Sequence, residues 1–258
     1  MQRGLTEHLI TASQTGFKAD ILQILAARNL FTGVICDIGL HQGQTLLELY
    51  GTGLPIRHYY GFDPNAQAIT IAERLITLNP CLSSARLLPW ACANQDIPIE
   101  FFRISEVDSG ATIKPLIRPD WYEERTGDWV PAYRLDTISP QLKLDNHFFL
   151  KIDVEGGELD VLQGAQTLLQ QWRPIIQCEV LHAHRSSELS DNNHHKHQLL
   201  RLLQQQGYIL FLCHLSNGGR RLADLELIQA FPSAVYADSP HTCDYLFLPQ
   251  ELVSQFNQ

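Results

Sequence analysis

The sequence lacks the cysteine spacing of disulfide-rich and zinc-binding proteins. Its six cysteines include no CxxC pair, and Cys36, Cys178 and Cys213 lie inside apolar runs. A cysteine in such a run usually behaves as a small buried hydrophobic residue. We therefore expect reduced cysteines in the core, and neither a disulfide framework nor a zinc site.

Long apolar segments are also missing. The N-terminal stretch MQRGLTEHLITASQTGF has no apolar core of the kind that a signal peptide needs. No run elsewhere in the sequence reaches the length that crosses a bilayer. Together with the reduced cysteines, these absences predict a cytoplasmic protein without a membrane span.

Positive charge is in short supply. The 19 Lys and Arg residues against 28 Asp and Glu residues give a formal net charge of -9. Such a balance disfavours a surface that binds phosphate groups, so we expect no nucleic-acid partner. It suits a site for a cationic ligand, although solubility is the more common reason for an acidic composition.

What the sequence does contain is enough hydrophobic material for one α/β domain. Hydrophobic residues make up 45% of its 258 residues, so the chain can bury a core of its own. Apolar residues recur at helical spacing over residues 5–29, which predicts one or two amphipathic helices. We expect the helices of residues 1–30 to pack on a single globular unit of residues 31–258.

Short apolar strands alternate with helical segments along this unit. The expected strands cover residues 33–39, 57–65, 84–93, 97–104, 147–153, 173–180, 208–215 and 241–249. The expected helices cover residues 44–53, 66–80, 157–172 and 198–207. This alternation predicts an α/β fold in which a mostly parallel sheet carries helices on both faces. The last two strands follow each other without a clear helix between them, which suggests an antiparallel ending.

Two polar segments interrupt this pattern. Residues 105–131 form the longest irregular stretch, and a loop of that length is usually disordered or functional, so we expect a lid. Its Trp121, Tyr122 and Trp129 could stack on a sugar or anchor the loop to the body. Residues 181–197 contain HHKH and are expected to form a loop; their histidines match no standard zinc spacing.

The turn DIGLHQGQT after the first strand indicates the kind of cofactor. A dinucleotide fold needs G-x-G-x-x-G there, but His41 stands at the second glycine position and Gln44 at the third. The bulky His41 would obstruct the phosphates, so NAD is disfavoured. S-adenosylmethionine (SAM) carries no phosphate, and Asp37 and Asp63 could hold its ammonium group and its ribose. Alternatively, the two acids only cap helices.

A second group of acids ends the strand at 147–153. Asp153, Glu155 and Glu158 surround the pair Gly156-Gly157, and Glu179 ends the next apolar strand. If these two strands are neighbours, Glu179 lies beside Asp153. Oxygen ligands of this kind could hold Mg²⁺, but no metal site is assigned. Glu158 is interpreted mainly as a first-turn helix acid.

Five segments resemble one known family in order and spacing. They are VICDIGLHQGQT, YYGFDPNAQA, VPAYRLDTI, FLKIDVEGGELDVLQGA and RPIIQCEV, and they resemble the FkbM-type SAM-dependent methyltransferases over about residues 30–182. The resemblance implies a class I methyltransferase (Rossmann-like) fold with SAM as methyl donor. It also implies O-methylation of a hydroxyl group on a sugar, glycolipid or secondary metabolite. The chain departs from the family at Leu40-His41, where Ala-Asn is common, and at Asp63, where Glu is usual.

The candidate site residues follow from these segments. The resemblance assigns the glycine turn (Asp37, Gly39, Gly43), the ribose acid Asp63 and the fourth-strand signature (Asp153, Glu155, Gly156). We add Leu40 of the turn and Trp90, which ends the third strand where an adenine would lie, although packing alone would also explain this aromatic residue. The expected cofactor-binding residues are therefore Asp37, Gly39, Leu40, Gly43, Asp63, Trp90 and Asp153. The expected catalytic residues are Asp153, Glu155, Glu179 and His182, the last because imidazole titrates near neutrality.

Two other functions stay open at this point. One is a nucleotide-dependent α/β enzyme, against which His41 counts. The other is a catalytically silent protein that binds SAM or a partner without turnover. For the methyltransferase we expect a small-molecule or glycan hydroxyl acceptor, and a homodimer stays open.

Overall fold

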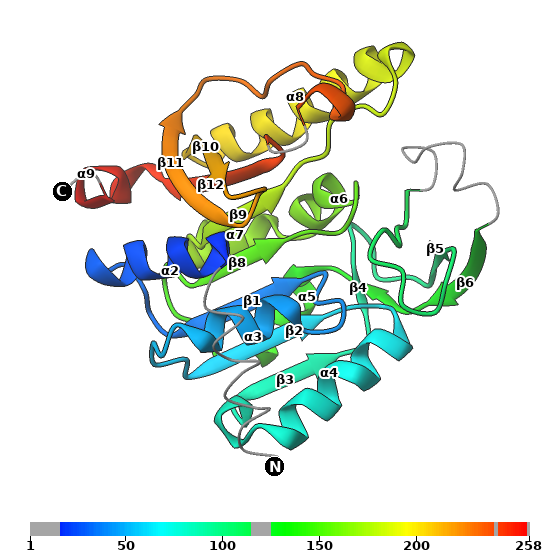
Figure 1. The fold of residues 1–258 in the computed structure, drawn as a ribbon, viewed down its shortest axis with the longest axis vertical. Helices are drawn as coiled ribbons and strands as arrows, with labels where there is room; N and C mark the ends of the chain where they lie inside the picture. The colour runs from blue at the N-terminus through cyan, green and yellow to red at the C-terminus, as the bar shows by residue number, and fades with distance from the viewer. Residues whose placement is uncertain (1–15, 115–124, 240–241, 257–258) are drawn as a thin grey trace.

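The computed structural model describes residues 16–114, 125–239 and 242–256. Within these ranges an eight-stranded sheet forms the centre of the molecule, in the order β11-β10-β12-β9-β8-β1-β2-β3 (Figure 1). Its strands are β1 (Val34–Ile38), β2 (His58–Phe62), β3 (Ala85–Leu88), β8 (Phe149–Ile152), β9 (Ile175–Glu179), β10 (Tyr208–Ser216), β11 (Arg221–Leu227) and β12 (Asp244–Pro249).

The strand directions confirm the fold class expected from the sequence. The strands from β3 to β9 pair in parallel, whereas β12 runs antiparallel to both of its neighbours, β9 and β10. The sheet is therefore mostly parallel with an antiparallel C-terminal strand, as the sequence predicted. The register pairs Ile38 with Phe62 on one side and with Ile152 on the other. The residues that follow these positions therefore emerge at one edge of the sheet.

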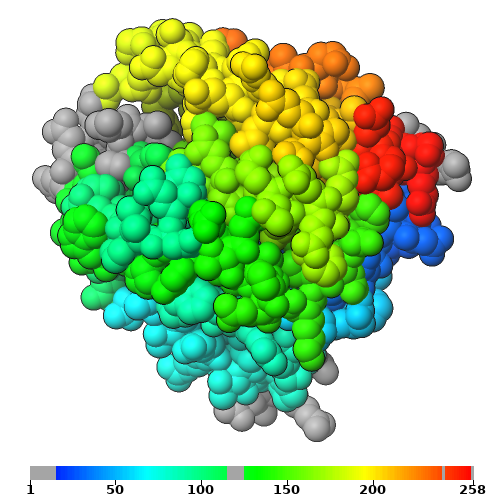
Figure 2. Space-filling view, turned by 180° about the vertical axis from the view of Figure 1, so that it is seen from behind, coloured from blue at the N-terminus to red at the C-terminus, as the bar shows by residue number. Residues whose placement is uncertain are grey.

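Helices cover both faces of the sheet. Apolar residues of α2, α3, α4 and α9 form one core with one face, and those of α5, α6, α7 and α8 form a second core with the other. The second layer lies on the side seen in Figure 2, where green and yellow atoms cover the sheet. The helices are α2 (Phe17–Ala27), α3 (Gln44–Gly51), α4 (Ala66–Leu78), α5 (Leu135–Ile138), α6 (Glu158–Gln163), α7 (Gln166–Trp172), α8 (Leu189–Gln205) and α9 (Val253–Phe256). None of the described helices combines the length and hydropathy that crossing a membrane requires.

Two small sheets flank the carboxyl edge of the central one. In the first, β4 (Ala91–Cys92) pairs in parallel with β7 (Ala132–Tyr133); in the second, β5 (Ile99–Arg103) pairs antiparallel with β6 (Thr126–Val130). The sequence correctly predicted a hairpin strand at β5. Its partner β6 lies inside the stretch expected to be irregular, so that expectation is wrong for residues 126–130. Trp121 and Tyr122 of the expected lid lie outside the described residues.

Three further segments differ from the sequence expectation. The histidines of HHKH belong to α8, because Leu199, Leu200 and Leu203 bury one face of a continuous helix that starts well before them. The helix expected over 157–172 is two helices, α6 and α7, because it breaks at Gly164. A side chain there would place its Cβ 2.0 Å from the carbonyl oxygen of Ala93. The edge strand β11 was not expected, since its residues are mostly exposed.

Candidate functional site

A cavity of about 340 Å³ lies at the carboxyl edge of the sheet. Its walls come from the turns after β1, β2 and β8, from the end of β9 and from residues 108–113. We call it the strand-end cavity. Open α/β sheets bind ligands at this edge, and small-molecule pockets measure roughly 300–1,000 Å³. The predicted site residues that line it are Gly39, Leu40, Asp63, Trp90, Asp153, Glu155 and Glu179.

The turn after β1 passes very close to the end of β8. Gly39 has a φ of +85°, and a Cβ at this position would lie 1.7 Å from the carbonyl oxygen of Asp153. No L-residue fits there without moving one of the two strands. The backbone N–H groups of Gly39 and Leu40 both donate to the carbonyl oxygen of Phe62, at 2.9 and 3.0 Å. The turn is therefore fixed between β2 and β8.

Two other residues of this turn, Leu40 and Gly43, pack against the neighbouring strand β2 and helix α4. Leu40 is buried and packs against Gly61 of β2, while it also lines the strand-end cavity. Gly43, with a φ of +89°, caps the start of α3 and faces Ala72 and Leu75 of α4. Gly43 does not line the cavity, so its place in the structure favours a role in the turn itself over direct cofactor contact.

A buried lysine, which the sequence analysis did not single out, lies beneath the cavity. The Nζ atom of Lys151 is 2.9 Å from Asp37 and 3.4 Å from Asp153, and it donates a 2.6 Å hydrogen bond to the carbonyl oxygen of Gly39. Burial disfavours its ammonium form, but the Asp153 and Asp37 carboxylates outweigh this effect and raise the pKa of Lys151. The signal in the sequence was a lysine within the buried strand FLKI.

Asp37 does not line the cavity, because its carboxylate is buried beneath it and paired there. Its side chain is 0% exposed, ion-pairs with Lys151 and accepts a hydrogen bond from the hydroxyl of Tyr59. The prediction that Asp37 holds a ligand's ammonium group is not supported by this position. Asp37 instead neutralises the lysine that is joined to both Gly39 and Asp153.

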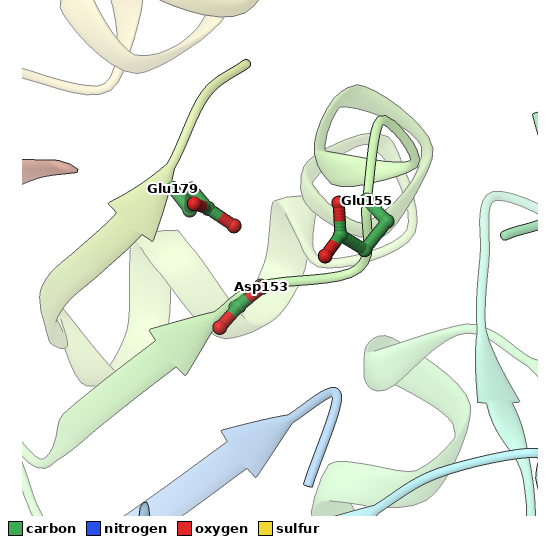
Figure 3. A group of neighbouring side chains, drawn as sticks. All are labelled: Asp153, Glu155 and Glu179. Atoms are coloured by element: carbon green, nitrogen blue, oxygen red, sulfur yellow. The ribbon is translucent and has the colours of Figure 1, made fainter. Parts of the chain in front are cut away.

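Asp153, Glu155 and Glu179 come together at the ends of β8 and β9 (Figure 3). Each offers one carboxylate oxygen, and these three atoms lie within 4.8 Å of one another. Burial disfavours the Asp153 carboxylate, but Lys151, then Lys18 and a hydrogen bond with Glu179, outweigh it and lower its pKa to about 2. Burial and the Asp153 charge raise the pKa of Glu179 well above its ordinary value. The two carboxyl groups are therefore shifted in opposite directions, and Glu179 takes up a proton more readily than Asp153 does.

Asp63 is held by the backbone of both neighbouring turns. Its two carboxylate oxygens accept hydrogen bonds from the N–H groups of His41, at 2.7 Å, and Asn65, at 2.8 Å. His41 has a φ of +52°, and its ring lies 3.2 Å from the carbonyl oxygen of Val107. Burial raises the pKa of Asp63, although these hydrogen bonds oppose the shift. His41 thus joins Asp63 to the segment that crosses the cavity.

Residues 104–114 cross the strand-end cavity. Besides the contact with His41, two hydrogen bonds hold this segment. The Asn65 side chain donates to the carbonyl oxygen of Glu106 at 3.0 Å, and the hydroxyl of Thr112, within the segment, donates to the carbonyl oxygen of Glu155 at 2.8 Å. On another wall, Trp90 packs edge-on against Tyr133, with ring centroids 5.0 Å apart. The cavity therefore has one wall from the expected lid and one aromatic wall.

His182 lies at a different cavity of about 250 Å³, lined also by Glu158, Leu181, Asn192 and His195; we call it the second cavity. His182 is 1% exposed, and its ring nitrogens lie 2.8 Å from Lys196 Nζ and 2.7 Å from the hydroxyl of Thr242. Burial and the Lys196 charge lower its pKa to about 4. The prediction that His182 is the base is therefore not supported by its position, because the ring does not line the strand-end cavity and both nitrogens are engaged.

Glu158 is a buried acid whose titration can be measured. It begins α6, is 1% exposed and accepts a 2.8 Å hydrogen bond from the N–H of Gly156. Burial raises its pKa to about 7, above the value of an unfolded chain. Its protonated form thus stabilises the fold below about pH 4.5 in full, and this contribution is lost as the pH rises through about 7.

We expect Glu158→Gln to remove this pH dependence while keeping an acceptor for Gly156. Relative to wild type, the variant should gain about 2–3 kcal/mol of unfolding free energy between pH 5 and pH 8. Denaturant unfolding at several pH values measures the difference, with the exposed Glu73→Gln as matched control. Parallel stability profiles for wild type and Glu158→Gln would contradict the assignment.

The comparison with protein families gives a match over most of the described sheet. Residues 37–210, more than half of the chain, match the Methyltransferase FkbM domain. This range contains the turn after β1, the end of β2, and the acids of β8 and β9. A search of curated proteins found no match.

Several solved structures also match this chain, at low sequence identity. Methyltransferase FkbM from Methylobacillus flagellatus KT shares 17% identity with a TM-score of 0.47, over 83% of this chain and 42% of that chain. Cofactor-bound Rv0187 from MTB shares 10% identity with a TM-score of 0.43, over 96% and 89% of the two chains. SAH-bound methyltransferase PaMTH1 from Podospora anserina shares 12% identity with a TM-score of 0.43, over 82% and 84%.

Proposed function

We propose that this chain, which belongs to the FkbM methyltransferase family, transfers a methyl group from SAM to a hydroxyl group of a sugar, glycolipid or secondary metabolite. One observation carries the proposal. The strand-end cavity brings Gly39, Asp63 and Asp153, from three different strand ends, around a single space. Gly39 and Asp153 are 114 positions apart in the sequence, and folding brings them to the same cavity.

The residues of the cavity fit SAM by size and by chemistry. A Cβ at Gly39 would fill the space where the turn meets Asp153, so the backbone itself forms this wall. Asp63 keeps lone pairs for ribose hydroxyls, because each of its oxygens accepts one hydrogen bond from the backbone and a carboxylate offers about four acceptor sites. Trp90 supplies an apolar wall for adenine.

SAM supplies a methyl group on a positively charged sulphur. Toward that charge the protein presents Asp153, which stays ionised because Lys151 holds its pKa at about 2. Such a weak base is poorly suited to removing a proton from a hydroxyl group. Burial and the Asp153 charge raise the pKa of Glu179, so Glu179 is the better proton carrier of the pair, and its hydrogen bond with Asp153 positions that carboxylate. This leaves Glu155, which also lines the cavity, as the proposed general base.

The experiment measures binding and turnover on the purified chain. Calorimetry should show that SAM binds and that NAD does not, because His41 lines the cavity where a dinucleotide needs a glycine. Radiolabelled SAM is then incubated with a panel of hydroxylated sugars, glycolipids and metabolites, with and without Mg²⁺. A labelled product supports the proposal. Binding of NAD in preference to SAM would refute it, and SAM binding without any product across the panel would favour a silent binding protein.

A further inference from the structure

Lys18 reaches the strand-end cavity from outside the matched family domain. It belongs to the first turn of α2, which packs against α3 and β11. Its side chain lines the strand-end cavity together with the acids of β8 and β9. No feature of the sequence indicated a site residue here, because Lys18 lies before residue 37 and follows no motif. The structure thus adds a second lysine, besides Lys151, to a cavity that carries several acids.

Within the described residues, two lysines line the cavity, Lys18 and Lys151. They differ in the number of polar partners that their ammonium groups have. Lys151 uses its three N–H groups on Asp37, Asp153 and the carbonyl oxygen of Gly39. Lys18 Nζ lies 4.5 Å from the centre of the Phe17 ring, and among the described residues it has no hydrogen bond or ion pair. Lys18 is therefore the lysine that can still receive an anion.

The start of α3 adds further donors beside Lys18. This eight-residue helix begins at Gln44, and its N-cap residue Gly43 has no side chain to cap it. The N–H groups of the first turn therefore have no side-chain acceptor there. Gln44 and Thr45 of this turn line the cavity. Thr45 is 8% exposed, and within the described ranges its hydroxyl makes no hydrogen bond. A helix start of this kind favours an anion.

Elsewhere the cavity repels negative charge. Besides Lys151, which is paired with Asp37 and Asp153, and the ring of His41, its other walls carry the acids Asp63, Asp108, Asp153, Glu155 and Glu179. The amino-acid end of SAM bears a carboxylate as well as an ammonium group. The acids suit the ammonium group. The carboxylate suits the region of Lys18 and Thr45, which make no side-chain hydrogen bond among the described residues.

We propose that Lys18 and the first turn of α3, through Thr45, bind the carboxylate of SAM. This assignment rests on the proposed function and adds to it a recognition element outside the family domain. It makes the N-terminal helix α2 part of the cofactor site. It also predicts that the enzyme distinguishes SAM from its decarboxylated form, which keeps the sulphonium and the ammonium group but lacks the carboxylate.

The test compares Lys18→Met with wild type by calorimetric titration of SAM and of decarboxylated SAM. Loss of a charge-assisted hydrogen bond should weaken SAM binding about 10- to 100-fold. Decarboxylated SAM should bind the variant as tightly as wild type or more tightly, because a repelling cation has been removed. Lys18→Arg should retain most of the affinity for SAM. The exposed Lys143→Met serves as matched control for the change in net charge.

The outcomes separate this assignment from the proposed function. If wild type binds neither ligand, the proposed function fails. If wild type binds SAM and Lys18→Met weakens both ligands equally, or neither, only the carboxylate assignment fails. Thr45→Val provides a second variant, which should lose affinity for SAM selectively even if Lys18→Met proves unstable. Thermal unfolding of each variant shows whether it is folded.

Discussion

Lys151→Met is expected to lower the free energy of unfolding by about 3–5 kcal/mol, since it leaves buried carboxylates without their cation. Lys151 is 1% exposed and Asp37 is 0% exposed, so water cannot replace the lost interaction. The same substitution removes the hydrogen bond to the carbonyl oxygen of Gly39. We therefore expect SAM binding to be lost along with the stability.

Denaturant unfolding of the purified variant measures this effect, with Lys143→Met as control at an exposed lysine. The double variant Asp37→Asn with Lys151→Met removes one of the uncompensated charges and should recover part of the stability. If Lys151→Met unfolds at the same denaturant concentration as wild type, Lys151 does not hold the strand ends together.

Asp153→Asn is expected to reduce kcat/KM for methyl transfer by about 10²–10³-fold, the range typical of losing one preorganised electrostatic group at the reacting atoms. The substitution keeps the shape of the side chain but removes the charge that faces the sulphonium and orients the hydroxyl group. It also removes a partner of both Lys151 and Glu179. Because Asp153 lies at the cavity surface, its side chain being 25% exposed, we expect the fold to persist.

Steady-state rates with labelled SAM, at saturating and limiting acceptor, measure the loss once an acceptor is known. The exposed Glu73→Gln, on the outer side of α4, is the control for removal of one negative charge. Activity of Asp153→Asn within tenfold of wild type would contradict the prediction and show that the charge of Asp153 is not needed for methyl transfer. A parallel loss in Glu155→Gln would support the assignment of the base to Glu155.

Local sequence determined much of the fold and the position of the site along the chain. Short apolar runs such as VICDI and FLKI form strands because they are long enough for a buried strand and too short for a helix. The glycine turn after β1 and the acids after β2, β8 and β9 were identified without the structure, because a polar residue directly after a buried strand must lie at the sheet edge. The local signal failed where tertiary contacts decide, as at β6, β11 and the first turns of α8.

The identity of the residues that face the cavity was decided by the tertiary structure. Asp37 and His182 were expected at the site, yet Asp37 is paired beneath it and His182 belongs to a different cavity. Lys18 and Lys151 lie 133 positions apart, and only the packing of α2 beside the sheet brings both to Asp153. The type of a residue determines which chemical groups it offers. Its burial and its partners determine its protonation state and the direction in which its side chain points. Both are properties of the folded chain, because they depend on atoms that are distant in the sequence.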